Sequence, residues 1–210
     1  EWPSTSEPGL VGVEAMRGIV LPKLKETRSD FRNLRFWSAA CATGQEPYSI
    51  AMVIDDMSRD FAGWRVDIIA SDVSQAALAA ARAGLYSQFE VQRGLPTPML
   101  LRYFRKEASG WRVSEHLQAA IDFRQINLVS EFGALGHFDV ILCRNVLMYM
   151  DVERRRDILR RISAQLAPDG YLLLGATETI VGLTDDFVAT PGFAGLFTHR
   201  PQKRASMRLV

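Results

Sequence analysis

The fold is decided by the stretch Phe36-Trp37-Ser38-Ala39-Ala40-Cys41-Ala42-Thr43-Gly44-Gln45-Glu46-Pro47-Tyr48-Ser49-Ile50. It opens with an apolar run typical of a buried strand, passes through small residues to a Thr-Gly turn, and continues as a helix. Pro47 fits the first turn of that helix, because the first helical amides have no partner within the helix. Small residues at a strand end let a ligand approach the backbone, where the free amides of the next helix face it. The stretch therefore predicts a site for a nucleotide-like ligand, or alternatively a tight connection that binds nothing.

Strand and helix patterns alternate along the chain beyond this stretch. Apolar runs predict strands at 35–41, 66–72, 121–126, 138–143 and 171–175, and amphipathic patterns predict helices at 47–59, 74–82 and 151–166. This alternation predicts a doubly wound α/β fold, with a mainly parallel sheet and helices on both faces. A segment at 193–199 alternates after a Pro-Gly turn and predicts a last, antiparallel edge strand.

Two regions depart from the alternation. Residues 1–34 predict a loose N-terminal segment and a linker helix at 13–25, kinked at Pro22. From about residue 95 to 118 the chain holds a turn, a short helix and a hairpin around a Ser-Gly turn. We expect this stretch to be a small antiparallel β-subdomain inserted into a domain that spans 35–210.

Composition excludes several classes of function. A net charge of +1 gives no reason to expect nucleic acid, and the three histidines and two cysteines show no metal-ligand spacing. Cys41 and Cys143 both end predicted buried strands, which favours reduced core residues in a cytoplasmic protein. No apolar run is long enough to span a bilayer, and no signal-peptide pattern is present. The arginines between 154 and 161 alternate with acidic residues, and we expect them on the solvated face of a helix.

Two acidic residues indicate what kind of ligand the first strand end would take. Asp72 ends the second strand, where a carboxylate either accepts hydrogen bonds from ribose hydroxyls or caps the next helix. Glu46 lies in the first turn of its helix, where it either favours the helix dipole or holds a cationic amino group or hydroxyl of the ligand. The loop has one glycine where a dinucleotide fingerprint needs three. A nucleoside without phosphates fits better than a nicotinamide dinucleotide, and S-adenosylmethionine is a common example.

Polar residues also follow the strands at 121–126 and 138–143. Asn127 can pair with an adenine edge while Leu128 packs on the ring, or Asn127 can simply form a turn. Arg144 and Asn145 emerge from a very apolar strand, and Tyr149 follows about one helical turn later. These three residues either contact a ligand at the carboxyl edge or only cap the sheet.

In these stretches the chain resembles the chemoreceptor glutamate methyltransferases, the CheR family. The matching segments are 36–49, 70–74, 81–86, 102–104, 138–146 and 174–179. The block Cys143-Arg144-Asn145-Val146 and the block at 38–48 are together highly specific to that family. The resemblance runs from about residue 13 to about residue 197.

The resemblance implies a Rossmann-like methyltransferase sheet of the seven-stranded type with the inserted β-subdomain. It implies S-adenosylmethionine as methyl donor, S-adenosylhomocysteine as product, and receptor glutamates as acceptors that become methyl esters. By motif position, the implied cofactor-binding residues are Ala40, Glu46, Asp72, Asn127, Leu128, Arg144 and Asn145. Tyr149 would lie by the methyl group and the substrate. The resemblance places Arg144 at the cofactor, and as a cation it could also help to steer the acceptor carboxylate if its side chain faces the substrate.

The implied partner is the cytoplasmic region of a chemoreceptor-type protein. An exposed edge of the inserted hairpin can accept an extended receptor segment by strand addition, or it only shields the sheet. We expect a monomer without nucleic acid, metal or membrane insertion. The chain departs from the family in its N-terminal residues, because no Asn-x-Thr-x-Phe-Phe-Arg motif precedes residue 14. A regulatory module that binds the cofactor with weak or no transferase activity is therefore the alternative function.

Overall fold

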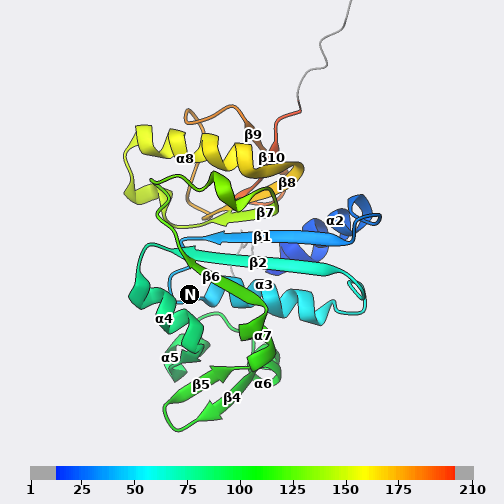
Figure 1. Cartoon of the computed structure of the whole chain (residues 1–210), viewed down its shortest axis with the longest axis vertical. Helices are drawn as coiled ribbons and strands as arrows, with labels where there is room; N and C mark the ends of the chain where they lie inside the picture. The colour runs from blue at the N-terminus through cyan, green and yellow to red at the C-terminus, as the bar shows by residue number, and fades with distance from the viewer. Residues whose placement is uncertain (1–12, 202–210) are drawn as a thin grey trace, which may run out of the picture.

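A seven-stranded sheet runs through the middle of the computed structural model, which describes residues 13–201 (Figure 1). The strand order is β6-β2-β1-β7-β8-β10-β9. The first five strands in this order are parallel, and the last two are antiparallel to their neighbours. The strands are β1 (Asn33–Ala39), β2 (Arg65–Asp72), β6 (Ile121–Gln125), β7 (Phe138–Cys143), β8 (Leu166–Leu174), β9 (Phe187–Ala189) and β10 (Leu196–His199). The mainly parallel, doubly wound sheet is thus confirmed.

Helices cover both faces of this sheet, and a separate apolar core lies under each. Successive side chains of β1 point to opposite faces, so Phe36 packs in one core and Trp37 in the other. The first core includes residues of α2 (Leu21–Thr27), α3 (Gln45–Asp56) and α4 (Gln75–Ala83). The second core holds the apolar face of α8 (Val152–Gln165). The predicted caps of α4 are present, with Ser74 at its start and a left-handed Gly84 at its end.

The linker helix is distorted just before Pro22, as predicted. It consists of α1 (Val13–Ala15), a π-helical turn η1 (Met16–Val20) and α2. The backbone N–H of Leu21 donates to the carbonyl of Met16, one residue further back than in an α-helix. The distortion follows from proline, which has no N–H for the regular ladder.

Two predictions for the last strands were wrong, namely that the segment 193–199 forms the edge of the sheet and that the strand before it begins at residue 171. The segment predicted as an edge strand is β10, and it lies between β8 and β9. The edge strand is β9, which has only three residues and therefore shows little alternation. Strand β8 begins at Leu166, directly after α8, and an irregularity between Phe138 and Val140 of β7 accommodates its first residues.

A second, three-stranded antiparallel sheet lies at one end of the molecule (Figure 1). Its order is β3-β5-β4, so it includes β3 from before residue 95. The three strands are β3 (Leu85–Tyr86), β4 (Phe104–Glu107) and β5 (Gly110–Val113). The helices of the same region are α5 (Gln88–Gln92), α6 (Thr97–Tyr103) and α7 (Glu115–Ala119). The predicted hairpin is present as β4 and β5. Tyr86 and Phe104 belong to the same core as α3, so the small sheet is packed onto the main one.

Two short 3-10 helices complete the described chain, η2 (Gly133–Leu135) and η3 (Leu147–Tyr149). Within residues 13–201, none of the helices combines the length and the apolar character that crossing a bilayer requires.

Candidate functional site

The carboxyl ends of β1, β2, β6 and β7 meet at one edge of the sheet, because these strands are parallel. Ala39 pairs with Ser71, and Asp72 pairs with Gln125. The arrowheads of β1 and β7 point to this edge, where α8 also begins (Figure 1). The ends of these strands and the segments that follow them hold all the predicted site residues, which are Ala40, Glu46, Asp72, Asn127, Leu128, Arg144, Asn145 and Tyr149.

The loop between β1 and α3 has an unusual backbone. Ala40 and Ala42 adopt positive φ angles of 61° and 47°, and Gly44 has a φ of 95°. The left-handed region costs a residue with a Cβ about 1–2 kcal/mol, so tertiary contacts must hold the two alanines there. One such contact is the hydrogen bond that the Ala42 amide donates to Asp72 at 2.9 Å. A Cβ on Gly44 would lie 2.9 Å from the Cβ of Ala81, so the predicted glycine turn is required by space as well as by φ.

Asp72 holds the loops after β1 and β2 together. Its Oδ2 accepts the Ala42 amide at 2.9 Å, and its Oδ1 accepts the Ser74 amide at 2.8 Å. The N-cap of α4 is Ser74, whose side chain accepts from the amide of Ala77, so Asp72 is not itself that cap. Each carboxylate oxygen has about two acceptor positions, so each oxygen of Asp72 has one position left for a ligand hydroxyl.

Glu46 and Arg144 form a mostly buried and incompletely satisfied pair. Ser38 Oγ donates to Glu46 Oε1 at 2.6 Å, and Arg144 Nη1 lies 3.4 Å from Glu46 Oε2. The exposed fractions of the two side chains are 15% for Glu46 and 17% for Arg144. Burial raises the pKa of Glu46 above its usual value, while Arg144 and the hydroxyl of Ser38 counteract the rise.

The Nε of Arg144 is buried and has no hydrogen-bond partner. Leaving a buried polar group unpaired costs about 1–3 kcal/mol or more, and ligand-binding sites are a common place to find one. A ligand with both an acceptor and a cationic group would satisfy Arg144 and Glu46 at once. The residues present therefore fit a zwitterionic, nucleoside-like ligand.

Asn127 and Leu128 lie at the same edge, but they present different surfaces. Asn127 is exposed, and its Oδ1 accepts from the amide of Val129 at 3.1 Å, which is the turn considered as the alternative. The Leu128 side chain is only 5% exposed and belongs to the core beneath α8. Their contacts with an adenine ring stay predictions.

Arg161 holds this loop in place, and the expectation that it is solvated was wrong. Its side chain is only 11% exposed. Its guanidinium donates to the carbonyls of Leu128 at 2.8 Å and Ser130 at 2.6 Å, and it lies over the ring of Phe132. The helical pattern of α8 does not distinguish Arg161 from its exposed neighbours. Its burial follows only from the position of the loop that holds Leu128 and Ser130.

The loop after β7 carries the predicted catalytic residues Arg144 and Tyr149 and, between them, the predicted cofactor-binding residue Asn145. Asn145 is exposed and has a positive φ of 57°. Tyr149 belongs to η3, and its side chain is 82% exposed without a hydrogen bond or ring contact to another described residue. The structure thus brings Glu46 and Arg144 together and leaves Tyr149 free at the surface.

One further residue at this edge received no role from sequence reasoning. Glu178 lies after β8, and its carboxylate accepts hydrogen bonds from backbone amides of Gly175, Asn145, Val146 and Met148. The segment 174–179 contributes to the sequence analysis only through the family resemblance. Nothing in its local pattern indicates a partner more than thirty positions away.

Comparison with known proteins gives a family match that covers all of these residues. Residues 12–194 match the family described as CheR methyltransferase, SAM binding domain. Chemotaxis protein methyltransferase 1 of Pseudomonas aeruginosa is 43% identical over 178 residues, which are 83% of this chain and 65% of that protein. Chemotaxis protein methyltransferase Cher2 of Pseudomonas putida is 40% identical over 178 residues, 83% of this chain and 64% of that protein. The matched part of the chain thus spans slightly less than two thirds of each relative.

Proposed function

The chain belongs to the CheR methyltransferase family and carries its S-adenosylmethionine-binding domain, and we propose that it methylates glutamate side chains of chemoreceptor-type proteins in bacterial chemosensory signalling. The observation that supports this most directly is the group of polar residues at the carboxyl edge. Asp72, Glu46 and Arg144 each have unused hydrogen-bonding capacity there. A phosphate-free nucleoside with an amino acid tail matches that capacity.

In this proposal residues that follow or end β1, β2, β6 and β7 hold the donor. Asp72 accepts hydrogen bonds from the ribose hydroxyls, Glu46 holds the cationic amino group, and Ala40 leaves room beside the backbone. Asn127 and Leu128 contact the adenine, and Arg144 and Asn145 complete the pocket from the β7 side. When bound, the donor would supply a methyl group on a sulfonium. The carboxylate oxygen of the acceptor attacks the methyl carbon in line with the C–S bond, so that a C–O bond forms, the C–S bond breaks, and its electron pair leaves with sulfur.

The acceptor needs no base from the protein. A glutamate side chain has a pKa of about 4.3 in water and is already ionised at neutral pH. All three histidines of the chain lie away from the carboxyl edge. His137 precedes β7 and His199 ends the antiparallel β10, both at the opposite edge, and His116 lies on α7 of the inserted region.

The task of the protein is then to orient the acceptor. Holding two reactants in line can lower a barrier by about 7–11 kcal/mol. We assign this task to Arg144, which attracts the incoming carboxylate, and to Tyr149, whose exposed hydroxyl can donate to it. A loose grip on the carboxylate is required, because strong ground-state binding does not accelerate the step.

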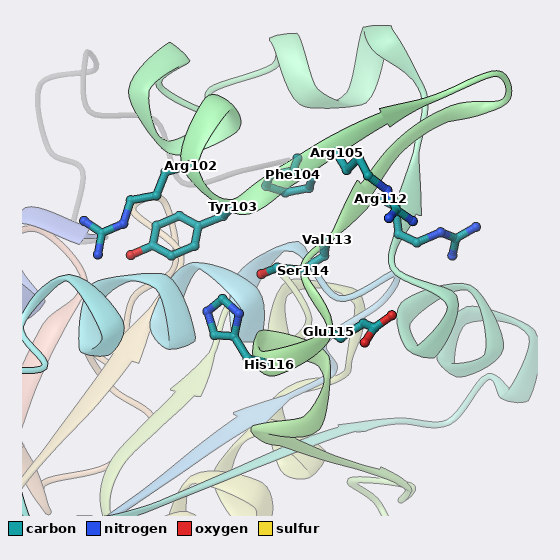
Figure 2. A pocket seen from close by; sticks show the side chains of 9 residues that line it. All are labelled: Arg102, Tyr103, Phe104, Arg105, Arg112, Val113, Ser114, Glu115 and His116. Carbon is teal, nitrogen blue, oxygen red and sulfur yellow. The ribbon is translucent and has the colours of Figure 1, made fainter.

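We further propose that a receptor segment docks on the inserted sheet. Strand β4 lies at the edge of that sheet and pairs only with β5 among the described residues. A cavity of about 440 Å³ lies beside it (Figure 2). The cavity is lined by Arg102, Tyr103, Phe104, Arg105, Arg112, Val113, Ser114, Glu115 and His116. Arg102 and Arg105 are each paired with acidic residues of this chain, but their side chains remain 56% and 77% exposed, so this rim can also contact an acidic, extended segment. A cytoplasmic location agrees with the two buried, unpaired cysteines.

The test is a methyl-transfer assay with labelled S-adenosylmethionine and receptor-containing membranes. Transfer to glutamate yields an ester, so labelled methanol should be released by base. Membranes without receptor serve as the control. Cofactor binding without base-labile label would reject the transferase and favour the alternative, a regulatory module that only binds the cofactor.

A further inference from the structure

We propose that Glu178 is a positioning residue that holds the loop after β7 in the geometry required for methyl transfer, an inference that rests on the proposed function. Glu178 does not belong to the group that would contact the cofactor. It acts from the loop after β8, through the backbone that carries Asn145 and Tyr149.

The carboxylate of Glu178 accepts four backbone hydrogen bonds. Oε2 accepts from the amides of Gly175 and Asn145, both at 2.8 Å. Oε1 accepts from the amides of Val146 and Met148, both at 3.2 Å. Hydrogen bonds to an ionised acceptor are about twice as strong as neutral ones. Three of the four donors belong to the loop after β7, so one side chain determines where this loop lies.

Gly175 completes the connection between the two loops. A Cβ at this position would lie 2.2 Å from Asn145 Oδ1 and 2.9 Å from Glu178 Oε2. The side chain of Asn145 therefore packs directly against the glycine. The strands that lead into these loops are also paired, through Cys143 and Leu174. The two loops are in contact here, and a Cβ at position 175 would force the ends of the Asn145 and Glu178 side chains to shift.

The position of Tyr149 depends on this arrangement. Its side chain is 82% exposed and is not held by other described residues, so the backbone of η3 is what sets the region that the hydroxyl can reach. The Tyr149 amide donates to the carbonyl of Val146 at 3.3 Å, and the Val146 amide donates to Glu178. The cofactor contacts of Glu46 and Asp72 arise from β1, β2 and α3 instead. Loss of the hydrogen bonds between Glu178 and the loop after β7 should therefore affect turnover more than cofactor affinity.

The substitution Glu178→Gln tests whether the carboxylate holds the loop after β7, because glutamine has the same shape but lacks the charge. It retains one acceptor oxygen, but its NH₂ group faces two backbone donors. We expect kcat to fall by up to about a hundredfold, because small displacements of reacting groups have effects of this size. The Kd for S-adenosylhomocysteine should rise much less, because Asn145 moves with the loop while Glu46 and Asp72 keep their places. Glu26→Gln is the matched control. It removes the same charge from an exposed side chain of α2 whose partner is Lys23, and it should behave like the wild type.

Amide hydrogen exchange supplies a readout that does not depend on activity. Exchange at Asn145, Val146 and Met148 should become faster in Glu178→Gln than in the wild type, while amides in the middle of α8 keep their rates. Gly175→Ala displaces the carboxylate of Glu178 from the other side and should also lower kcat more than it raises the Kd. It also replaces Glu178→Gln if that variant does not fold.

Two results would overturn the inference. One is wild-type kcat in a folded Glu178→Gln or Gly175→Ala variant, and the other is unchanged exchange at the three loop amides. A wild-type protein that binds the cofactor but methylates nothing would reject the proposed function. In that case the exchange rates would still decide whether Glu178 holds the loop.

Discussion

Asp72→Asn should weaken the binding of S-adenosylhomocysteine by a factor that follows from the hydrogen bonds of the carboxylate. Each oxygen already accepts one backbone amide, from Ala42 at 2.9 Å and from Ser74 at 2.8 Å, and has one position left for a ribose hydroxyl. A hydrogen bond to a charged group contributes about 1.5–3 kcal/mol. Asparagine keeps one acceptor oxygen, so one of the two bonds is lost, which amounts to about 10- to 10²-fold in Kd.

Asparagine is the informative replacement because it preserves the shape of the side chain. It leaves one oxygen, and its NH₂ group faces either the Ala42 or the Ser74 amide. Alanine would remove the acceptor that helps to hold Ala42 in its left-handed conformation, so a loss of affinity there would mix loop distortion with the lost contact.

Calorimetry with two ligands isolates the contact. The wild type should bind S-adenosylhomocysteine far more tightly than an analogue without the two ribose hydroxyls, and Asp72→Asn should lose most of this preference. Asp122→Asn, on the neighbouring β6, makes the same chemical change in an exposed side chain paired with Arg124. It should keep the wild-type preference. If Asp72→Asn discriminates between the ligands as well as the wild type does, the carboxylate does not contact the ribose.

Three other predictions concern the same edge. Arg161→Gln should raise the Kd for S-adenosylhomocysteine and lower the melting temperature, with little change in kcat at saturating donor, because the loop of Leu128 loses its charged donors; unchanged affinity would refute this role. Tyr149→Phe should lower kcat more than affinity and leave the melting temperature unchanged, because the ring is 82% exposed; wild-type kcat would show that the hydroxyl is not used. Burial raises the pKa of Glu46, so cofactor affinity should weaken as pH falls through that raised pKa, because the proton removes the charge that holds the amino group. The contribution of Glu46 to the free energy of unfolding of the ligand-free protein has the opposite trend and falls as pH rises through the same range, because the folded state holds this proton more tightly than the unfolded chain. Calorimetry as a function of pH would detect the step in affinity, which Glu46→Gln should lack.

Local chemistry alone determines much of this protein. The apolar run before Ala40, the glycine at position 44 and the serine at position 74 predict a strand, a turn and a helix start from their immediate neighbours. Alternation of strands and helices then implies parallel strands, and parallel strands bring their carboxyl ends to one edge. For this reason Asp72 and Arg144 could be placed at one site although they are far apart in the chain.

Contacts between distant segments carry no such local pattern. Glu178 accepts amides from a loop 33 positions away, and Arg28 donates to Asp139 across 111 positions. Arg161 has the same helical spacing as its solvated neighbours, yet it is buried against the loop of Leu128. Periodicity reports which face of an element is apolar, but only strand order and register decide which loop that face meets. The residues that line the carboxyl edge could therefore be predicted from the sequence. The side chains that hold its loops in place could be identified only from the tertiary structure.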